Sequence, residues 1–213
     1  MGSKPKGPKR DYRERAYRAL GVGKGLVSFQ VQVKETDLLI QARKNLRAPA
    51  YQAVLRYRFP MAAVAGAMAE FVGRDLLGES PEVIVENGGD LFIQLSRELK
   101  IAIFAGPSPL SMRVGLKISE SAKGLGVCTS SGTVGPSLSF GRADAVCILS
   151  PSAALADAAA TAVGNVVKSA GDLTTGLETA QSIEGVTGAV LIVGEKMGAW
   201  GKVELFEMKP ENP

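Results

Sequence analysis

One segment constrains this chain more than any other: the run VIVENGGDLFI, from Val83 to Ile93. Two stretches rich in β-branched and apolar residues flank the tetrapeptide Asn87-Gly88-Gly89-Asp90. Turns whose two central residues need positive φ favour Asn-Gly and Gly-Gly, so the run predicts two antiparallel strands joined by a tight turn. Glycine also lets a backbone approach a ligand closely and offer its N–H groups to a phosphate. A structural turn and a ligand contact are both open interpretations here.

The remaining pattern predicts an α+β fold, with a mostly antiparallel sheet or sheets and packed helices. Strands are expected at residues 26–33, 38–42, 82–86, 90–95, 99–105, 112–118, 125–129, 143–149, 189–194 and 202–207. Helices are expected at residues 45–58, 60–78, 151–170 and 175–183. Ser150 is the expected cap of the third helix, with Pro151 in its first turn and Gly171 closing it.

Charge is concentrated at the beginning of the chain. The net charge is +4, but residues 1–24 hold eight basic and two acidic residues, which leaves the remainder slightly acidic. Residues 1–11 predict a disordered basic arm, and residues 12–213 a single domain. The body shows no basic footprint for a phosphate backbone, and aromatic residues make up only 6% of the chain. We therefore expect no nucleic-acid partner.

Histidine is absent from the chain. This excludes Ser-His-Asp and Cys-His catalysis, as well as histidine-ligated metal sites. Any metal must be held by oxygen ligands, which favours Mg²⁺, Ca²⁺ or Mn²⁺. The two cysteines, Cys128 and Cys147, lie in apolar strand segments and are expected to be buried free thiols. No apolar run is long enough to span a membrane.

Two further segments carry groups suited to ligand binding. In Cys128-Thr129-Ser130-Ser131-Gly132-Thr133, four hydroxyls at a strand end can bind the hydroxyls or the pyrophosphate of a ligand, or can belong to an ordinary polar turn.

The second segment is the expected helix after Pro151. Its polar residues Asp157, Thr161, Asn165 and Lys168 form one stripe on an otherwise small, apolar helix. The stripe either faces solvent or, at Asp157 and Thr161, places a carboxylate and a hydroxyl one turn apart for a hard cation.

These segments together resemble the ApbE-like superfamily, whose best-known members transfer FMN from FAD onto proteins. The motifs that carry the resemblance are PMAAVAG, VENGGD, CTSSGT, SFG-ADAV and ADA-AT, in this order. A short branch of ApbE-related proteins shares them almost unchanged. The resemblance covers most of the chain from Tyr12 to Glu204.

The resemblance implies roles for ten residues. The Gly-Gly-Asp turn and the Thr-Ser-Gly segment line the flavin pocket in the superfamily, and the Asp and Thr of the Ala-Asp-Ala-x-x-Thr pattern bind Mg²⁺. The implied contacts to FAD or FMN are Asn87, Gly88, Gly89, Asp90, Thr129, Ser130, Ser131 and Gly132. The implied Mg²⁺ ligands are Asp157 and Thr161.

The chain also departs from the transferases. Their Asp-Leu-Gly-Gly-Ile-Ala-Lys-Gly segment corresponds to residues 60–66 here, without the lysine, and their His-x-x-Asp-Pro segment has no counterpart in residues 135–141. Two hypotheses follow: a Mg²⁺-dependent flavin-nucleotide transferase or hydrolase with an acceptor protein, or a flavin- or nucleotide-binding module without chemistry. No catalytic residue is assigned.

Two further expectations rest on the same resemblance. The lipoprotein export signal of many superfamily members is missing, so a cytoplasmic protein is expected. Relatives carry a few dozen additional residues where Arg58 meets Phe59, so we expect a segment to be missing at this junction.

Overall fold

The computed structural model describes residues 24–33, 36–56, 64–119, 121, 123–134 and 141–208. The expected basic arm and the junction of Arg58 with Phe59 both lie outside these residues.

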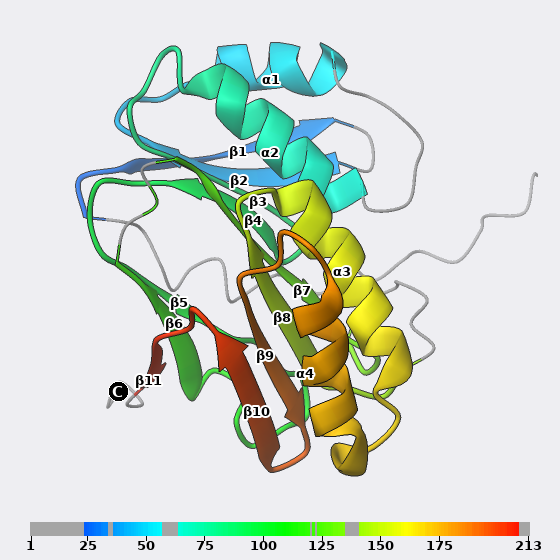
Figure 1. The fold of residues 1–213 in the computed structure, drawn as a ribbon. Coiled ribbons are helices and arrows are strands. Elements are labelled where there is room, and N and C mark those ends of the chain that lie inside the picture. The colour runs from blue at the N-terminus through cyan, green and yellow to red at the C-terminus, as the bar shows by residue number, and fades with distance from the viewer. Residues whose placement is uncertain are drawn as a thin grey trace, which may run out of the picture.

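An eight-stranded sheet forms the centre of the molecule (Figure 1). Each pair of neighbouring strands is antiparallel. In spatial order the strands are β1 (Val27–Val33), β2 (Thr36–Ala42), β3 (Val83–Asn87), β4 (Asp90–Gln94), β7 (Leu125–Ser130), β8 (Ala145–Ser150), β9 (Gly188–Val193) and β10 (Lys196–Gly201). Chain neighbours are sheet neighbours except between β4 and β7, where the chain leaves the sheet.

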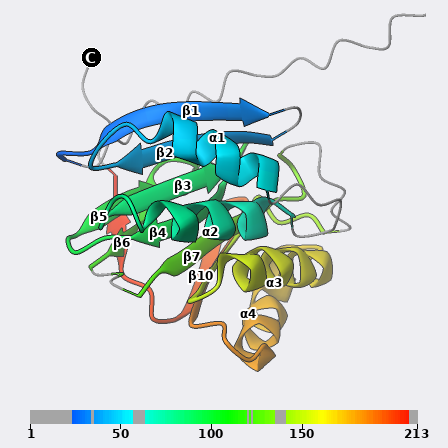
Figure 2. The ribbon, with the colours of Figure 1, turned by 90° about the horizontal axis from the view of Figure 1, so that it is seen from above.

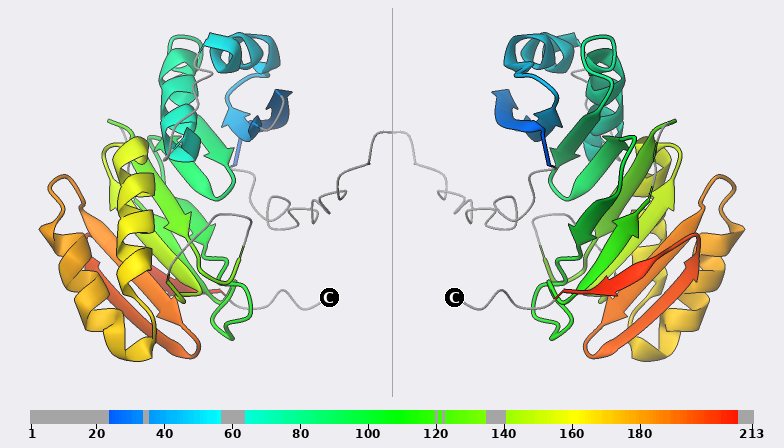
Figure 3. Two further views of the ribbon diagram at one scale, coloured as in Figure 1. Left: turned by 90° about the vertical axis from the view of Figure 1, so that its right-hand side faces the viewer. Right: turned by 90° about the vertical axis from the view of Figure 1, so that its left-hand side faces the viewer.

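The excursion between β4 and β7 builds a second sheet. The strands β5 (Leu99–Ala102) and β6 (Val114–Ile118) pair with each other, and β11 (Leu205–Glu207) from the C-terminal part joins β6. The second sheet and the helices lie on opposite faces of the large sheet (Figure 3). A ligand cavity can therefore form on the side that the helices leave uncovered.

Among the described residues, four α-helices cover the other face of the large sheet (Figure 2). They are α1 (Arg47–Arg56), α2 (Val64–Leu76), α3 (Ala153–Val166) and α4 (Leu173–Ser182), with a short 3-10 turn η2 (Ala170–Asp172) before α4. Because both faces of the sheet are covered, its strands bury consecutive residues: Phe92 packs under the helices and Ile93 packs between the two sheets. The expected α+β class is confirmed.

The start of α3 differs from the expectation. Ser152, not Ser150, is the N-cap, and its hydroxyl accepts a hydrogen bond from the Leu155 N–H. Ser150 belongs to β8, where its hydroxyl accepts the Ser152 N–H. The helix ends at Val166 rather than near residue 170, and Val167 in extended conformation is its C-cap, so Gly171 does not close it.

Strand β10 was not expected from the sequence. Its Gly198 sits where an added Cβ would lie 3.0 Å from a Leu177 methyl group, so α4 packs closely over this edge strand. Glycine weakens a local strand signal, and the close packing that favours it here is tertiary. The expected strand over residues 202–207 is shorter than predicted, because only Leu205–Glu207 is a strand, and it belongs to the second sheet.

Candidate functional site

A cavity of about 610 Å³ lies between the large sheet and the second sheet. One wall comes from β2, β3, β4 and β7, and the other from β5, β6, β11 and the loop between β5 and β6. Helices α2 and α3 also reach the cavity, through Ala65, Asp157 and Thr161. Nine of the ten implied site residues line it: Asn87, Gly88, Gly89, Asp90, Thr129, Ser130, Ser131, Asp157 and Thr161. Gly132 does not. The structure thus brings three distant segments to one place, while their binding roles stay predictions.

The Gly88-Gly89 turn is a two-residue hairpin loop that joins β3 to β4. Asn87 pairs with Asp90, and the two glycines have φ values of 71° and 107°. The conformation alone therefore requires glycine. The Gly89 N–H donates to Glu86 Oε1 at 2.7 Å, so this N–H is already engaged within the turn. A Cβ at either glycine would meet no atom within 4 Å, which leaves open space above the turn.

Asp90 connects the glycine turn, Gly88-Gly89, to the hydroxyl-rich segment, residues 129–133. Its side chain is buried, and Oδ1 accepts a hydrogen bond from the Thr129 N–H at 3.2 Å. Burial, together with the negative charge of the neighbouring Asp157, raises the pKa of Asp90 to about 8. The charges of two carboxyl groups from different segments therefore interact at this cavity, and ionising both is unfavourable without a compensating cation.

Asp157 also has a structural partner. Its Oδ2 accepts a hydrogen bond of 2.9 Å from the Gly66 N–H in the first turn of α2, a group that has no partner within its own helix. Burial raises the pKa of Asp157. The Asn87 side-chain amide donates to the Ala65 carbonyl at 3.3 Å, which ties the glycine turn to the same end of α2. Thr161, one turn further along α3, is exposed at the cavity.

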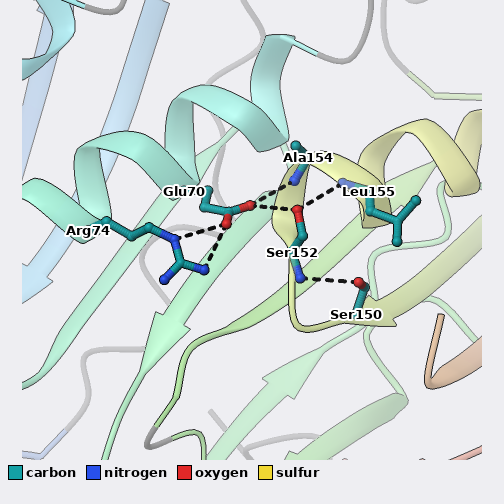
Figure 4. A network of polar contacts seen from close by, with 6 residues as sticks. All are labelled: Glu70, Arg74, Ser150, Ser152, Ala154 and Leu155. Atoms are coloured by element: carbon teal, nitrogen blue, oxygen red, sulfur yellow. Dashed lines mark hydrogen bonds and ion pairs between the residues drawn. The ribbon is translucent and has the colours of Figure 1, made fainter. Parts of the chain in front are cut away.

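Helix α2 in turn supplies a carboxylate, that of Glu70, to the beginning of α3 (Figure 4). The buried Glu70 accepts hydrogen bonds at Oε2 from the Ser152 hydroxyl (2.8 Å) and the Ala154 N–H (3.2 Å). Its Oε1 accepts two from Arg74. Burial opposes ionisation, but the bonds from Arg74, Ala154 and Ser152 prevail and lower the pKa of Glu70. Each helix thus supplies a carboxylate to the other's first turn.

The sequence analysis missed Glu70. Its only sequence signal is that it is the one acidic residue in the apolar run from Ala62 to Val72. Through the first turn of α3, Glu70 holds the helix that carries Asp157.

Asp144 stabilises the hydroxyl-rich loop, residues 129–134, through hydrogen bonds. This buried residue accepts a hydrogen bond from the Thr133 hydroxyl (2.9 Å) and another from the Gly194 N–H (2.7 Å). Within the loop, the Ser131 hydroxyl accepts the N–H groups of Thr133 and Val134 at 3.1 and 3.0 Å. The Ser131 side chain therefore stabilises the turn itself, as the alternative interpretation of this segment predicts.

The donor set of the cavity fits a hard cation. Asp90, Asp157 and Thr161 supply only oxygen atoms, the ligand type that Mg²⁺ prefers, and the phosphate of a nucleotide with water can complete the shell. Within the described part of the chain, no group of three or more Asp, Glu, Cys or His residues could hold a metal by itself. Binding of a cation at this cavity would therefore depend on the phosphate oxygens of a bound nucleotide.

The opposite wall of the cavity is apolar, and the sequence analysis did not foresee it. It carries Phe104 and Met112 from the loop after β5, and Phe206 and Met208 from the C-terminal part. Lys100 is the only basic residue among the described residues that line the cavity. These residues are distant in sequence and carry no shared motif.

Both cysteines are buried free thiols, as expected. Burial raises the pKa of Cys147 to about 11 and that of Cys128 well above its ordinary value, so neither is a thiolate at neutral pH. Among the described helices, none combines the length and the apolar character that crossing a membrane requires.

A family model described as AbpE bacteria matches residues 59–187, more than half of the chain. The chain belongs to this ApbE-like family. It is 42% identical over 149 residues to a UPF0280 protein of Methanococcus aeolicus, a match that covers 68% of this chain and 60% of the relative. It is 43% identical over 177 residues to a UPF0280 protein of Methanothrix thermoacetophila, covering 82% and 74%.

The chain spans about 60% of the length of several of the curated relatives it matches. A solved structure, that of Pseudomonas stutzeri flavinyl transferase ApbE in the apo form, aligns with 66% of this chain and 48% of its own. The TM-score is 0.45 and the sequence identity is 19%. The matched family region contains the glycine turn, the hydroxyl-rich loop and Asp157.

Proposed function

We propose that this ApbE-like protein binds a flavin nucleotide, FAD or FMN, together with Mg²⁺. One observation carries the proposal: the glycine turn, the hydroxyl-rich loop and the Asp157–Thr161 turn line a single cavity whose opposite wall is apolar. A flavin nucleotide needs both surfaces, since its ring system is flat and largely apolar and its phosphate is anionic. The cavity volume is also typical of small-molecule sites.

The proposed Mg²⁺ ligands are Asp157 and Thr161, and Asp90 lines the same cavity. A bound dication would stabilise both carboxylates in their ionised form and would attract the nucleotide phosphate. Family membership supports this assignment, because the residues stand in the family's Ala-Asp-Ala-x-x-Thr and Gly-Gly-Asp patterns. Binding of the nucleotide and the metal requires neither a reaction nor an acceptor protein.

For the chemistry, we propose transfer or hydrolysis at the FAD pyrophosphate, the reaction type of the superfamily's transferases. The alternative is binding without turnover, and a specific observation favours it. The transferases' lysine and their His-x-x-Asp-Pro segment have no counterpart in this sequence.

The test begins with the purified full chain. Its absorbance spectrum is read for bound flavin, and FAD is then titrated with Mg²⁺ and with EDTA. Mg²⁺-dependent binding supports the proposed function, and equal binding in EDTA contradicts the metal site. Released AMP, measured by chromatography after incubation with FAD and Mg²⁺, indicates chemistry. Tight binding without AMP release supports the binding module.

A further inference from the structure

The apolar wall of the cavity has its own architecture. In β5, Leu99, Lys100 and Ile101 all line the cavity, and Leu99 and Ile101 also pack against the core between the sheets. The Phe206 ring lies against Gly115 of β6, where an added Cβ would be 2.4 Å from the ring. The Lys100 ammonium group lies 5.5 Å from the centre of the same ring. Backbone and cation thus hold this aromatic side chain in place.

Beside it, the loop after β5 presents two more large apolar side chains. Phe104 is 42% exposed although it lines a cavity. Met112 has a φ of 60°, and it is the only residue other than glycine with positive φ in the described part of the chain. This conformation is unfavourable for a residue with a Cβ, and such strain is concentrated at ligand sites. The Met112 N–H donates to the Ile103 carbonyl at 2.8 Å, which fixes the strained turn.

We infer that this wall, made by Phe104, Met112 and Phe206, is the binding site for the flat ring system of the ligand. The inference rests on the proposed function and deepens it by giving the cavity two halves. The isoalloxazine ring lies against the aromatic wall, and the phosphate lies at the end formed by Asp157 and Thr161. Ring stacking explains why an exposed phenylalanine and a strained methionine face the same cavity.

Three ligands test the ring half and the phosphate half of the cavity separately. Riboflavin carries the ring without phosphate, inorganic pyrophosphate carries phosphate without a ring, and FMN carries both. Affinities are measured by isothermal titration calorimetry with Mg²⁺ present. Phe104→Ala should weaken riboflavin and FMN by the same factor, about fivefold to tenfold, and leave pyrophosphate unchanged. Asp157→Asn should weaken pyrophosphate and FMN but leave riboflavin unchanged.

The matched control is Phe71→Ala on α2. Phe71 is 46% exposed, close to the 42% of Phe104, but it is not among the residues that line the cavity. Both variants should keep the melting temperature within a few degrees of each other. A second variant, Met112→Gly, relieves the positive φ, so it should keep or raise the melting temperature while it weakens riboflavin binding. A purely structural role of Met112 would not separate these two readouts.

The outcomes are distinct. If the wild-type protein binds neither FMN nor riboflavin, the proposed function fails and this inference fails with it. If the wild-type protein binds both, but Phe104→Ala binds riboflavin as tightly as Phe71→Ala does, only the ring site is overturned. Loss of riboflavin affinity in Phe104→Ala, with pyrophosphate affinity preserved, supports it.

Discussion

Replacing Gly66 by alanine should separate α2 from α3. A Cβ at this position would lie 2.3 Å from the Ala153 carbonyl oxygen and 2.7 Å from the Asp157 Cβ. Apolar contacts are most favourable near 3.5–4.0 Å, so the two helices must move apart by roughly 1 Å. The obstructing atoms include backbone, which cannot rotate away as the end of a flexible side chain can.

The expected cost follows from two opposing effects. Overpacking typically destabilises by about 1–3 kcal/mol, and the better helix propensity of alanine returns up to about 1 kcal/mol. The net loss should be about 1–2 kcal/mol, which corresponds to about 2–8 °C in melting temperature for a chain of this size. Because the Gly66 N–H donates to Asp157, the same movement should weaken Mg²⁺-dependent binding of FMN.

Gly78→Ala provides the matched control just beyond the other end of α2. Its added Cβ would find its nearest neighbour, the Asp75 carbonyl oxygen, at an ordinary 3.6 Å. This variant should stay within about 0.5 kcal/mol of the wild type. Urea denaturation and thermal melting of both variants compare the two sites directly. Equal stability of Gly66→Ala and Gly78→Ala would refute the reasoning that close helix contact requires glycine here.

Three further predictions concern the polar groups. Glu70→Gln should cost about 2 kcal/mol at neutral pH, measured by urea denaturation. Folding lowers the pKa of Glu70 below 4.5, so the stabilisation by its carboxylate is present above that pH and is lost as the pH falls further. The free energy of unfolding of the variant should therefore depend less on pH in this acidic range than that of the wild type. Parallel curves of unfolding free energy against pH would contradict this. Asp157→Asn should weaken FMN binding and abolish its dependence on Mg²⁺, and Thr161→Val should reduce that dependence less, because water can replace a hydroxyl ligand. Equal affinities in calorimetry would remove the metal site. Asp144→Leu should destabilise the protein by about 2–4 kcal/mol in urea, since two hydrogen bonds to a buried carboxylate are lost. Asp144→Asn should cost less because its amide can still accept one bond and donate to a hydroxyl, and identical losses would argue against this bonding.

The local features of the fold could be predicted from the sequence. The Asn-Gly-Gly-Asp turn, the strands on either side of it and the small apolar helix around Asp157 were all foreseen, because φ preference and hydrophobic pattern act within a few residues. The α+β class followed from the order of these elements. The helix boundary near residue 150 was wrong by two residues, because Ser150 and Ser152 are equivalent caps until pairing in β8 uses one of them.

The site was only partly predictable. Motif resemblance named nine residues that line the cavity, but it could not show that the charges of Asp90 and Asp157 interact or that the Gly89 N–H is engaged by Glu86. Those relations depend on how β3, β4 and α3 are placed in space. A pKa raised by burial and by a second carboxylate likewise has no signature in the order of residues.

The sequence by itself thus determined the turns, the alternation of apolar residues and the oxygen-only chemistry of any metal site, since these depend on residue type and short spacing. Only the tertiary structure decided the apolar wall, the edge strand β10 and the exchange of carboxylates between α2 and α3. In each of these, residues far apart in the chain meet, as when Phe104 and Phe206 line one cavity. Such contacts depend on the packing of whole sheets and helices. This packing forms only when the chain folds cooperatively, and the pattern of neighbouring residues does not specify it.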